Sequence, residues 1–110
     1  MKEQDLAVSR TLPQPSTDDI DLVTVLRALA DPVRLELLRG MAAFEGPSPC
    51  SVDAYDVDVK AATLSHHFRV LREAGVTTTY AEGRHRRVEL RRADLDKRFP
   101  GLLDAVLVLG

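Results

Sequence analysis

The segment KAATLSHHFRVLREAG, residues 60–75, constrains the fold more than any other part of the sequence. Leu64, Phe68 and Leu71 recur at the spacing that lines one face of an α-helix. Gly75 has no Cβ, so it can adopt the left-handed conformation that ends many helices. We therefore predict a helix over this segment, with one apolar face turned toward a core.

The opposite face of this predicted helix is small, hydroxylic and basic over its first turns. At about 100° per residue, Ala62, Thr63, His66 and Arg69 point away from the apolar face, and Ser65 lies beside it. Small side chains let a helix backbone approach the floor of a DNA major groove, and short polar groups then reach base edges. The profile predicts a helix that recognises DNA.

Two runs of residues together resemble the ArsR/SmtB family of bacterial winged-helix repressors. ATLSHHFRVLREAGV, residues 62–76, is similar to the recognition helix of that family, and LRALADPVRLELL, residues 26–38, is similar to the helix-turn-helix before it. The resemblance covers residues 20–90. It implies a winged helix-turn-helix fold, mainly α-helical with a small β-hairpin wing, in a dimeric repressor that a metal ion or another signal often releases from DNA.

The net charge of −2 hides an uneven distribution of charge along the chain. Residues 1–59 carry 5 basic and 11 acidic side chains, whereas residues 60–92 carry 8 basic and 3 acidic ones. DNA binding depends on local basic patches rather than on the net charge. The second half of this basic segment, residues 76–90, has β-branched residues on both sides of a Glu82-Gly83 turn, which predicts a β-hairpin. Its basic residues are expected to contact phosphates and the minor groove, as a wing does: Arg84, His85, Arg86 and Arg87.

The other predicted elements are helices that surround the recognition helix. Residues 1–16 are expected to form a flexible arm because Pro13 and Pro15 prevent a regular helix, or else to pack Leu6, Val8 and Leu12 across a dimer. Residues 17–110 then form one domain. The first predicted helix covers residues 18–30 with Thr17 as N-cap. The second begins at Pro32 with Asp31 as N-cap, ends between residues 40 and 44, and has Leu35, Leu38, Met41 and Ala42 on its core face. Further helices are expected over residues 51–55, followed by an irregular turn, over residues 93–99, and in the apolar tail after Pro100.

The segment before the recognition helix departs from the resembled family. Family members have a longer helix between the positions equivalent to Val52 and Thr63, and here this helix is shorter and rich in aspartate. The angle at which the recognition helix is presented is therefore left open. The two ends of the domain are unusually apolar, which predicts dimerisation through the terminal helices, with contacts from Leu22, Leu26, Leu102, Leu103, Val106 and Leu107.

The chain carries one cysteine, Cys50, which excludes an internal disulfide framework and fits a reducing compartment. With no membrane-spanning run and no signal peptide, a cytoplasmic protein is expected. The family's metal sites need paired thiolates or histidine ligands on the last helix, and the tail offers only Asp104. We therefore predict no metal and no cofactor. Cys50 is either a small structural residue or a thiol-reactive, redox-responsive switch.

The sequence contains none of the constellations that an enzyme needs, such as a nucleophile with an oriented base or a phosphate loop. We therefore expect a DNA-binding transcriptional regulator, a repressor that binds a palindromic operator as a homodimer and responds to an unidentified small-molecule or redox effector. The alternative is a winged-helix module that binds proteins and not DNA. The expected DNA contacts are base-edge contacts from Ala62, Thr63, Ser65 and His66, phosphate contacts from Lys60, Arg69 and Arg72, wing contacts from residues 84–87, and a contact from His67, which is equally placed to be half-buried.

Overall fold

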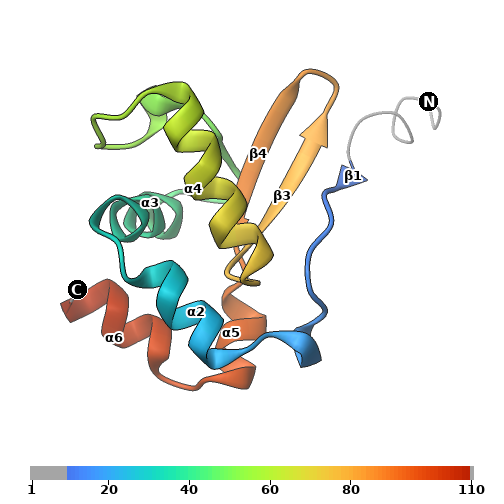
Figure 1. The fold of residues 1–110 in the computed structure, drawn as a ribbon, viewed down its shortest axis with the longest axis vertical. Helices are drawn as coiled ribbons and strands as arrows, with labels where there is room; N and C mark the ends of the chain where they lie inside the picture. The colour runs from blue at the N-terminus through green and yellow to red at the C-terminus, as the bar shows by residue number, and fades with distance from the viewer. Residues whose placement is uncertain (1–9, 110) are drawn as a thin grey trace.

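The computed structural model describes residues 10–109, in which a bundle of helices packs against one side of a β-hairpin (Figure 1). This architecture confirms the predicted winged helix-turn-helix fold, mainly helical with a small antiparallel hairpin. The helices are α2 (Leu22–Leu29), α3 (Pro32–Ala43), α4 (Ala61–Glu73), α5 (Arg92–Arg98) and α6 (Leu102–Leu109), with 3₁₀ turns η1 (Thr17–Asp19) and η2 (Val52–Ala54). The strands are β1 (Arg10–Thr11), β2 (Ser48–Pro49), β3 (Thr77–Glu82) and β4 (His85–Leu90).

The hairpin of β3 and β4 forms the centre of a small antiparallel sheet with strand order β1-β3-β4-β2. Its register pairs Thr77 with Leu90 and Glu82 with His85, so that only Gly83 and Arg84 lie in the turn. Gly83 has a φ of 62°, which a two-residue hairpin turn requires and glycine adopts without strain. The tip of the hairpin and the N-terminal end of α4 lie at the same end of the molecule, away from α2, α5 and α6 (Figure 1).

The first predicted helix is wrong in its extent, because residues 18–30 form two elements rather than one. Thr17 begins the short η1 turn, and α2 begins only at Leu22, where the carboxylate of Asp21 accepts a hydrogen bond from the backbone N–H of Thr24 at 3.0 Å. Between them, Ile20 is extended and buried. Its side chain fills the space beside Gly75, where a Cβ atom would lie 2.7 Å from Ile20 Cγ1. Gly75 has a φ of 86° and ends α4 as predicted.

Helix α3 begins as the sequence predicts. The carboxylate of Asp31 accepts hydrogen bonds from the backbone N–H groups of Val33 and Arg34, at 2.8 and 3.0 Å, and Pro32 occupies the first turn. The predicted core face is only partly right. Leu37, Leu38 and Met41 are buried, whereas Leu35 is half-buried and Ala42 is exposed. The reason is that α3 contacts α2, α4, β4 and α6, so its buried surface is turned toward several elements rather than along one stripe.

The last residues of the predicted flexible arm are packed against the wing. Arg10 and Thr11 pair with Ala81 and Tyr80 of β3, and the N–H of Leu12 donates to the carbonyl of Thr79 at 2.9 Å. This pairing covers a strand edge that otherwise exposes unpaired backbone groups. Residues 1–9, including Leu6 and Val8, lie outside the described part of the chain.

The two terminal helices differ from their predicted role in one residue. The sequence predicts Leu103 at a dimer interface, but this residue is 1% exposed, because it belongs to the core of its own chain. Leu102, Val106 and Leu107 are half-buried against the same core, and Val108 is 78% exposed. The exposed apolar surface lies mainly on α2, on Leu22, Val23 and Leu26. Among the described helices, none combines the length and the apolar character that crossing a bilayer requires.

Candidate nucleic-acid interface

Helix α4 presents two faces of opposite character. Leu64, Phe68 and Leu71 are buried in the core, and Phe68 packs edge-on against Tyr55 with ring centroids 5.8 Å apart. The outward face of its first two turns carries no large apolar side chain and no carboxylate. The exposed residues on and beside this face are Lys60, Ala61, Ala62, Thr63, Ser65, His66 and Arg69.

His66 and Arg69 lie together on the exposed face. Nη2 of Arg69 is 3.3 Å from Nδ1 of His66, one helical turn away. Because a guanidinium only donates, this contact orients the imidazole with Nδ1 as acceptor and leaves its other edge free for a partner outside the protein. The pair therefore offers one cation and one hydrogen-bonding ring at the position where a helix meets a groove.

His67 is predicted from the sequence as a DNA contact or as a half-buried residue, and the structure places it in the interior. It is 8% exposed, and its Nδ1 accepts from Nη1 of Arg34 at 3.0 Å. The same guanidinium donates from Nε to the carbonyl of Ala28, so Arg34 joins α2, α3 and α4. The side-chain partner of His67 is thus an arginine. His67 is inaccessible to DNA in this conformation.

The environment of His67 predicts a loss of stability in mild acid. Burial lowers the pKa of the ring below its ordinary value, Asp31 raises it and Arg34 lowers it further. Below about pH 6.5 the unfolded chain binds a proton that the native ring resists. The contribution of the neutral His67 ring to the free energy of unfolding is therefore fully present above this pH and decreases as the pH falls below it. Thermal unfolding on either side of that pH should show a smaller drop in Tm for His67→Gln than for the wild type. Equal drops in His67→Gln and the wild type would contradict the assignment.

The four basic residues of the wing are exposed but differ in their surroundings. Arg84 lies in the hairpin turn, and among residues 10–109 it forms no ion pair. Nε of Arg87 is 3.1 Å from Oε1 of Glu82. Arg86 lies on the same face of β4 as the buried Val88, because side chains alternate along a strand, and this face is turned toward α4. The sequence gives no reason to distinguish these arginines. In the structure, Arg87 contacts Glu82 and Arg86 lines the space beside α4, whereas Arg84 does neither among the described residues.

Arg72 is predicted from the sequence to contact phosphates, and the structure places it on the side of α4 that faces the hairpin. It is half-buried, and its Nε is fully buried with no hydrogen-bond partner in the described part of the chain. It lines a cleft between α4 and the sheet that we call the wing cleft, formed by Leu12, Cys50, Ser65, Phe68, Arg72, Thr79 and Arg86. The helical periodicity of residues 60–75 cannot identify Thr79 and Cys50 as lining residues of this cleft, because Thr79 belongs to β3 and Cys50 follows β2.

Cys50 is half-buried in the wing cleft. Burial raises the pKa of its thiol to about 11, although Arg86 and Arg72 oppose this rise. The thiol therefore stays protonated near neutral pH, and the thiolate is the form that reacts with oxidants and binds metals. This state disfavours the redox-switch alternative. Within residues 10–109, no three histidine, cysteine, aspartate or glutamate side chains are grouped so that they could hold a metal ion.

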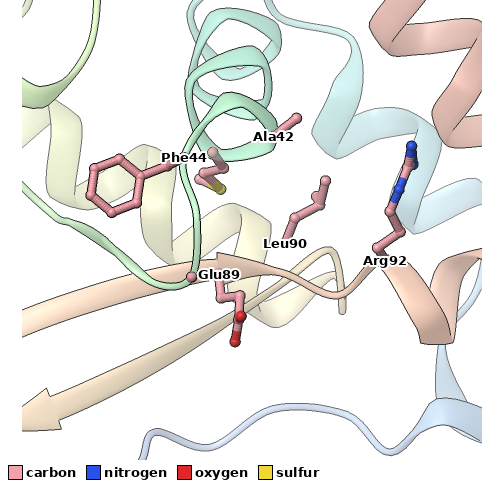
Figure 2. Close-up of a pocket in the computed structure, with 7 residues that line it drawn as sticks. Ala42, Phe44, Glu89, Leu90 and Arg92 are labelled. Carbon is pink, nitrogen blue, oxygen red and sulfur yellow. The ribbon is translucent and has the colours of Figure 1, made fainter.

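A second hollow, of about 200 Å³, lies between the end of α3 and the junction of β4 with α5 (Figure 2). It is lined by two charged residues together with Met41, Ala42, Phe44, Gly46 and Leu90. Glu89 accepts a hydrogen bond from the hydroxyl of Tyr80 at 2.9 Å, and Arg92 donates to Asp104 at 3.0 Å. In Figure 2, Leu90 and Glu89 point to opposite sides of β4. Both charged residues therefore already contact another side chain of this protein.

Two comparisons relate the chain to known helix-turn-helix proteins. A helix-turn-helix domain family matches residues 29–80, from the end of α2 into β3. The chain is also similar to YceK of Bacillus subtilis (strain 168), an uncharacterized HTH-type transcriptional regulator, with 30% identity over 90 residues. That alignment covers 82% of this chain and 90% of the relative. On this likeness across nearly the whole length of both proteins, the chain belongs to the family of HTH-type transcriptional regulators.

Proposed function

We propose that the protein is a DNA-binding transcriptional repressor of the ArsR/SmtB type, acting in the cytoplasm as a homodimer on a palindromic operator. One observation carries the proposal: the small, polar outward face of α4 lies at the same end of the molecule as the basic wing tip. A duplex that receives α4 in its major groove then has the wing beside its backbone. The name of the relative, a transcriptional regulator, supports the same reading.

The proposed contacts follow the exposure of each residue. Base edges are contacted by Ala62, Thr63, Ser65 and His66, whose short side chains let the helix approach the groove floor. Phosphates are contacted by Lys60, by Arg69 and by the wing from Arg84 to Arg87. We leave out His67, which is buried against Arg34, and Arg72, whose Nε faces the interior.

Selection of bound sequences from a random DNA pool, followed by gel shifts with random-sequence competitor, tests this proposal. The expected product is an imperfect palindrome with half-sites about one helical turn apart. A reporter gene downstream of the selected site should then be transcribed less when the protein is present. A protein that enriches no sequence and binds random DNA no better than a neutral control would instead favour the protein-interaction module.

The proposed homodimer rests on the exposed apolar surface of α2. Leu22, Val23 and Leu26 are each more than two-fifths exposed in the single chain. Exposed apolar side chains grouped on one helix are a surface on which a second copy can pack. Because α2 lies at the end opposite the wing tip, a partner bound there leaves both recognition helices free (Figure 1).

Leu26→Asp should convert the dimer into a folded monomer. Leu26 is 46% exposed, so the substitution spares the core of the single chain but buries two like charges near the two-fold axis, at a cost of several kcal/mol. Sedimentation velocity at micromolar concentration should show the change in mass, with an unchanged helical circular dichroism spectrum. Phe44→Asp is the matched control, since Phe44 is 48% exposed but lies at the end of α3. A wild-type monomer, or a Leu26→Asp dimer, would contradict the interface.

A further inference from the structure

The wing cleft is a built cavity between the recognition helix, the sheet and the N-terminal segment. Its volume is about 130 Å³, several times the roughly 10–15 Å³ that one water needs. The N–H of Leu12 donates to the carbonyl of Thr79, so the segment after β1 forms one wall. Phe68 supplies an apolar base, and most of the other lining side chains are polar or charged.

More of the surface that lines the cleft is apolar than polar, but its polar side chains include several hydrogen-bond donors. The hydroxyl of Thr79, a residue 3% exposed, has no hydrogen-bond partner in the described part of the chain, and neither has the buried Nε of Arg72. Arg86 adds a second guanidinium, and Ser65 and Cys50 add a hydroxyl and a thiol. Of the residues from 10 to 109, no aspartate or glutamate lines the cleft. Buried donors without acceptors are costly, and a bound acceptor would remove that cost.

We propose that the wing cleft binds a small free anion with several oxygen acceptors, either an inorganic oxyanion or a short carboxylate. Its oxygens accept from the guanidinium of Arg86, and from the hydroxyl of Thr79 and Nε of Arg72 once the side chains around these two atoms, which are closed to solvent in this structure, move aside. Charge-assisted hydrogen bonds of this kind are the strong ones. A DNA phosphate offers the same chemistry, but on a duplex lying against the outward face of α4 it reaches Lys60 or Arg69 rather than a hydroxyl at the base of a cleft.

The anion also has a predictable effect on DNA binding, and this second part rests on the proposed function. The cleft joins α4 to the wing, the two elements assigned to DNA, and a bound anion neutralises Arg72 and Arg86 between them. The bound state should therefore have a lower affinity for the operator. By linkage, operator DNA should lower the affinity for the anion by the same factor.

The test is a titration of the full chain, without DNA, followed by amide chemical shifts. Phosphate, sulfate and acetate are added separately, with chloride used to hold the ionic strength constant. At least one of the three should give saturable shifts centred on Cys50 and Thr79. Thr79→Val, which keeps the shape of the side chain and removes the donor, should weaken that binding by about 10- to 100-fold.

Thr77→Val is the matched control. Thr77 is 0% exposed and its hydroxyl equally has no partner among the described residues, yet it does not line the cleft. Both valine variants should have a higher Tm than the wild type in anion-free buffer, since each removes an unsatisfied buried hydroxyl. Only Thr79→Val should lose anion binding. Absence of saturable shifts in the wild type, equal losses in both variants, or shifts centred on Lys60 and Arg69 would overturn the site.

Gel shifts with and without the bound probe anion complete the test. Operator affinity should fall in the wild type as the cleft fills and should stay constant in Thr79→Val. If the anion binds and operator affinity does not change, the coupling is overturned and the site stands. If the protein binds no operator, the proposed function fails, and the DNA-free titration still decides the anion site.

Discussion

Replacing Tyr55 with alanine should lower the free energy of unfolding by about 3–5 kcal/mol, as for other buried aromatic residues. The ring is 8% exposed and packs edge-on against Phe68 of α4. Its hydroxyl shares a 2.6 Å hydrogen bond with Oγ of Ser48, and its ring lies directly against Gly40 of α3. One side chain thus joins α3, the sheet and the recognition helix. Urea unfolding followed by circular dichroism measures the loss, which is a large share of the total stability of a small domain.

Two further substitutions separate the stabilisation from the ring of Tyr55 from that of its hydroxyl and of its contact with Gly40. Tyr55→Phe should cost only about 1 kcal/mol, because Ser48 keeps its other bond to the carbonyl of Val88. Gly40→Ala should cost about 1–3 kcal/mol through overpacking, although alanine is the better helix former. Its Cβ would lie 2.6 Å from Cδ1 of Tyr55. A stabilising Gly40→Ala, or a Tyr55→Ala that costs no more than Tyr55→Phe, would contradict this account.

Tyr55 also answers a question that the sequence leaves open. The segment before the recognition helix is too short and too acidic for a regular helix, and only the 3₁₀ turn Val52–Ala54 forms there, close to the short helix predicted over residues 51–55. Tyr55, which directly follows this turn, contacts Gly40 of α3 and Phe68 of α4 and so attaches the segment to both helices. Neither residue is near Tyr55 in the sequence. A pattern of local residues therefore predicts the short helix but not these contacts.

The same distinction explains which parts of the fold the sequence predicts. Helices α3 and α4 and the hairpin have local signals: an Asp31-Pro32 start, a Gly75 stop and a Gly83 turn. The start of α2 has no unique local signal, since several aspartates near it are good caps. Asp21 becomes the cap because Ile20 is drawn into the core beside Gly75. Tertiary packing, rather than a local sequence signal, therefore determines which aspartate caps α2.

The candidate site divides in the same way. The outward face of α4 follows from helical periodicity, and Thr63 and His66 are exposed where the period places them. His67 and Arg72 lie near the edge of the apolar face, where periodicity decides little. Their positions are set by partners on other elements, Arg34 for His67 and the wing cleft for Arg72. The role of a long polar side chain at the edge of an apolar helix face can therefore be assigned only from the tertiary structure.

Thr63→Ala and His66→Ala should each weaken operator binding by about 1–3 kcal/mol per half-site, if the proposed base contacts are correct. In a symmetric dimer each substitution is made twice, so the expected loss is about 2–6 kcal/mol. Binding to random DNA should change little, because base contacts add nothing to it. Both residues are exposed and outside the core, so unfolding is not expected to contribute. Gel shifts on operator and on random DNA measure the two affinities.

Substitutions in the wing should change DNA affinity in a different way from substitutions in α4. This difference tests the division of roles between α4 and the hairpin. Arg84→Ala should weaken operator and random DNA alike. It should also flatten the plot of log affinity against log salt by about 0.9 for each phosphate that the side chain no longer neutralises, or about two units in the dimer. Arg87→Ala should act in the same direction but less strongly, because Arg87 must give up its 3.1 Å contact with Glu82 before it can reach a phosphate.

Glu82→Gln is the matched control for the wing variants, since it frees Arg87 from its ion pair and should raise affinity for both DNAs. The measurements need several salt concentrations, because a single one cannot distinguish a loss of specificity from a loss of electrostatic attraction. Wing variants that lose operator preference with an unchanged salt slope would assign base reading to the hairpin and overturn this division.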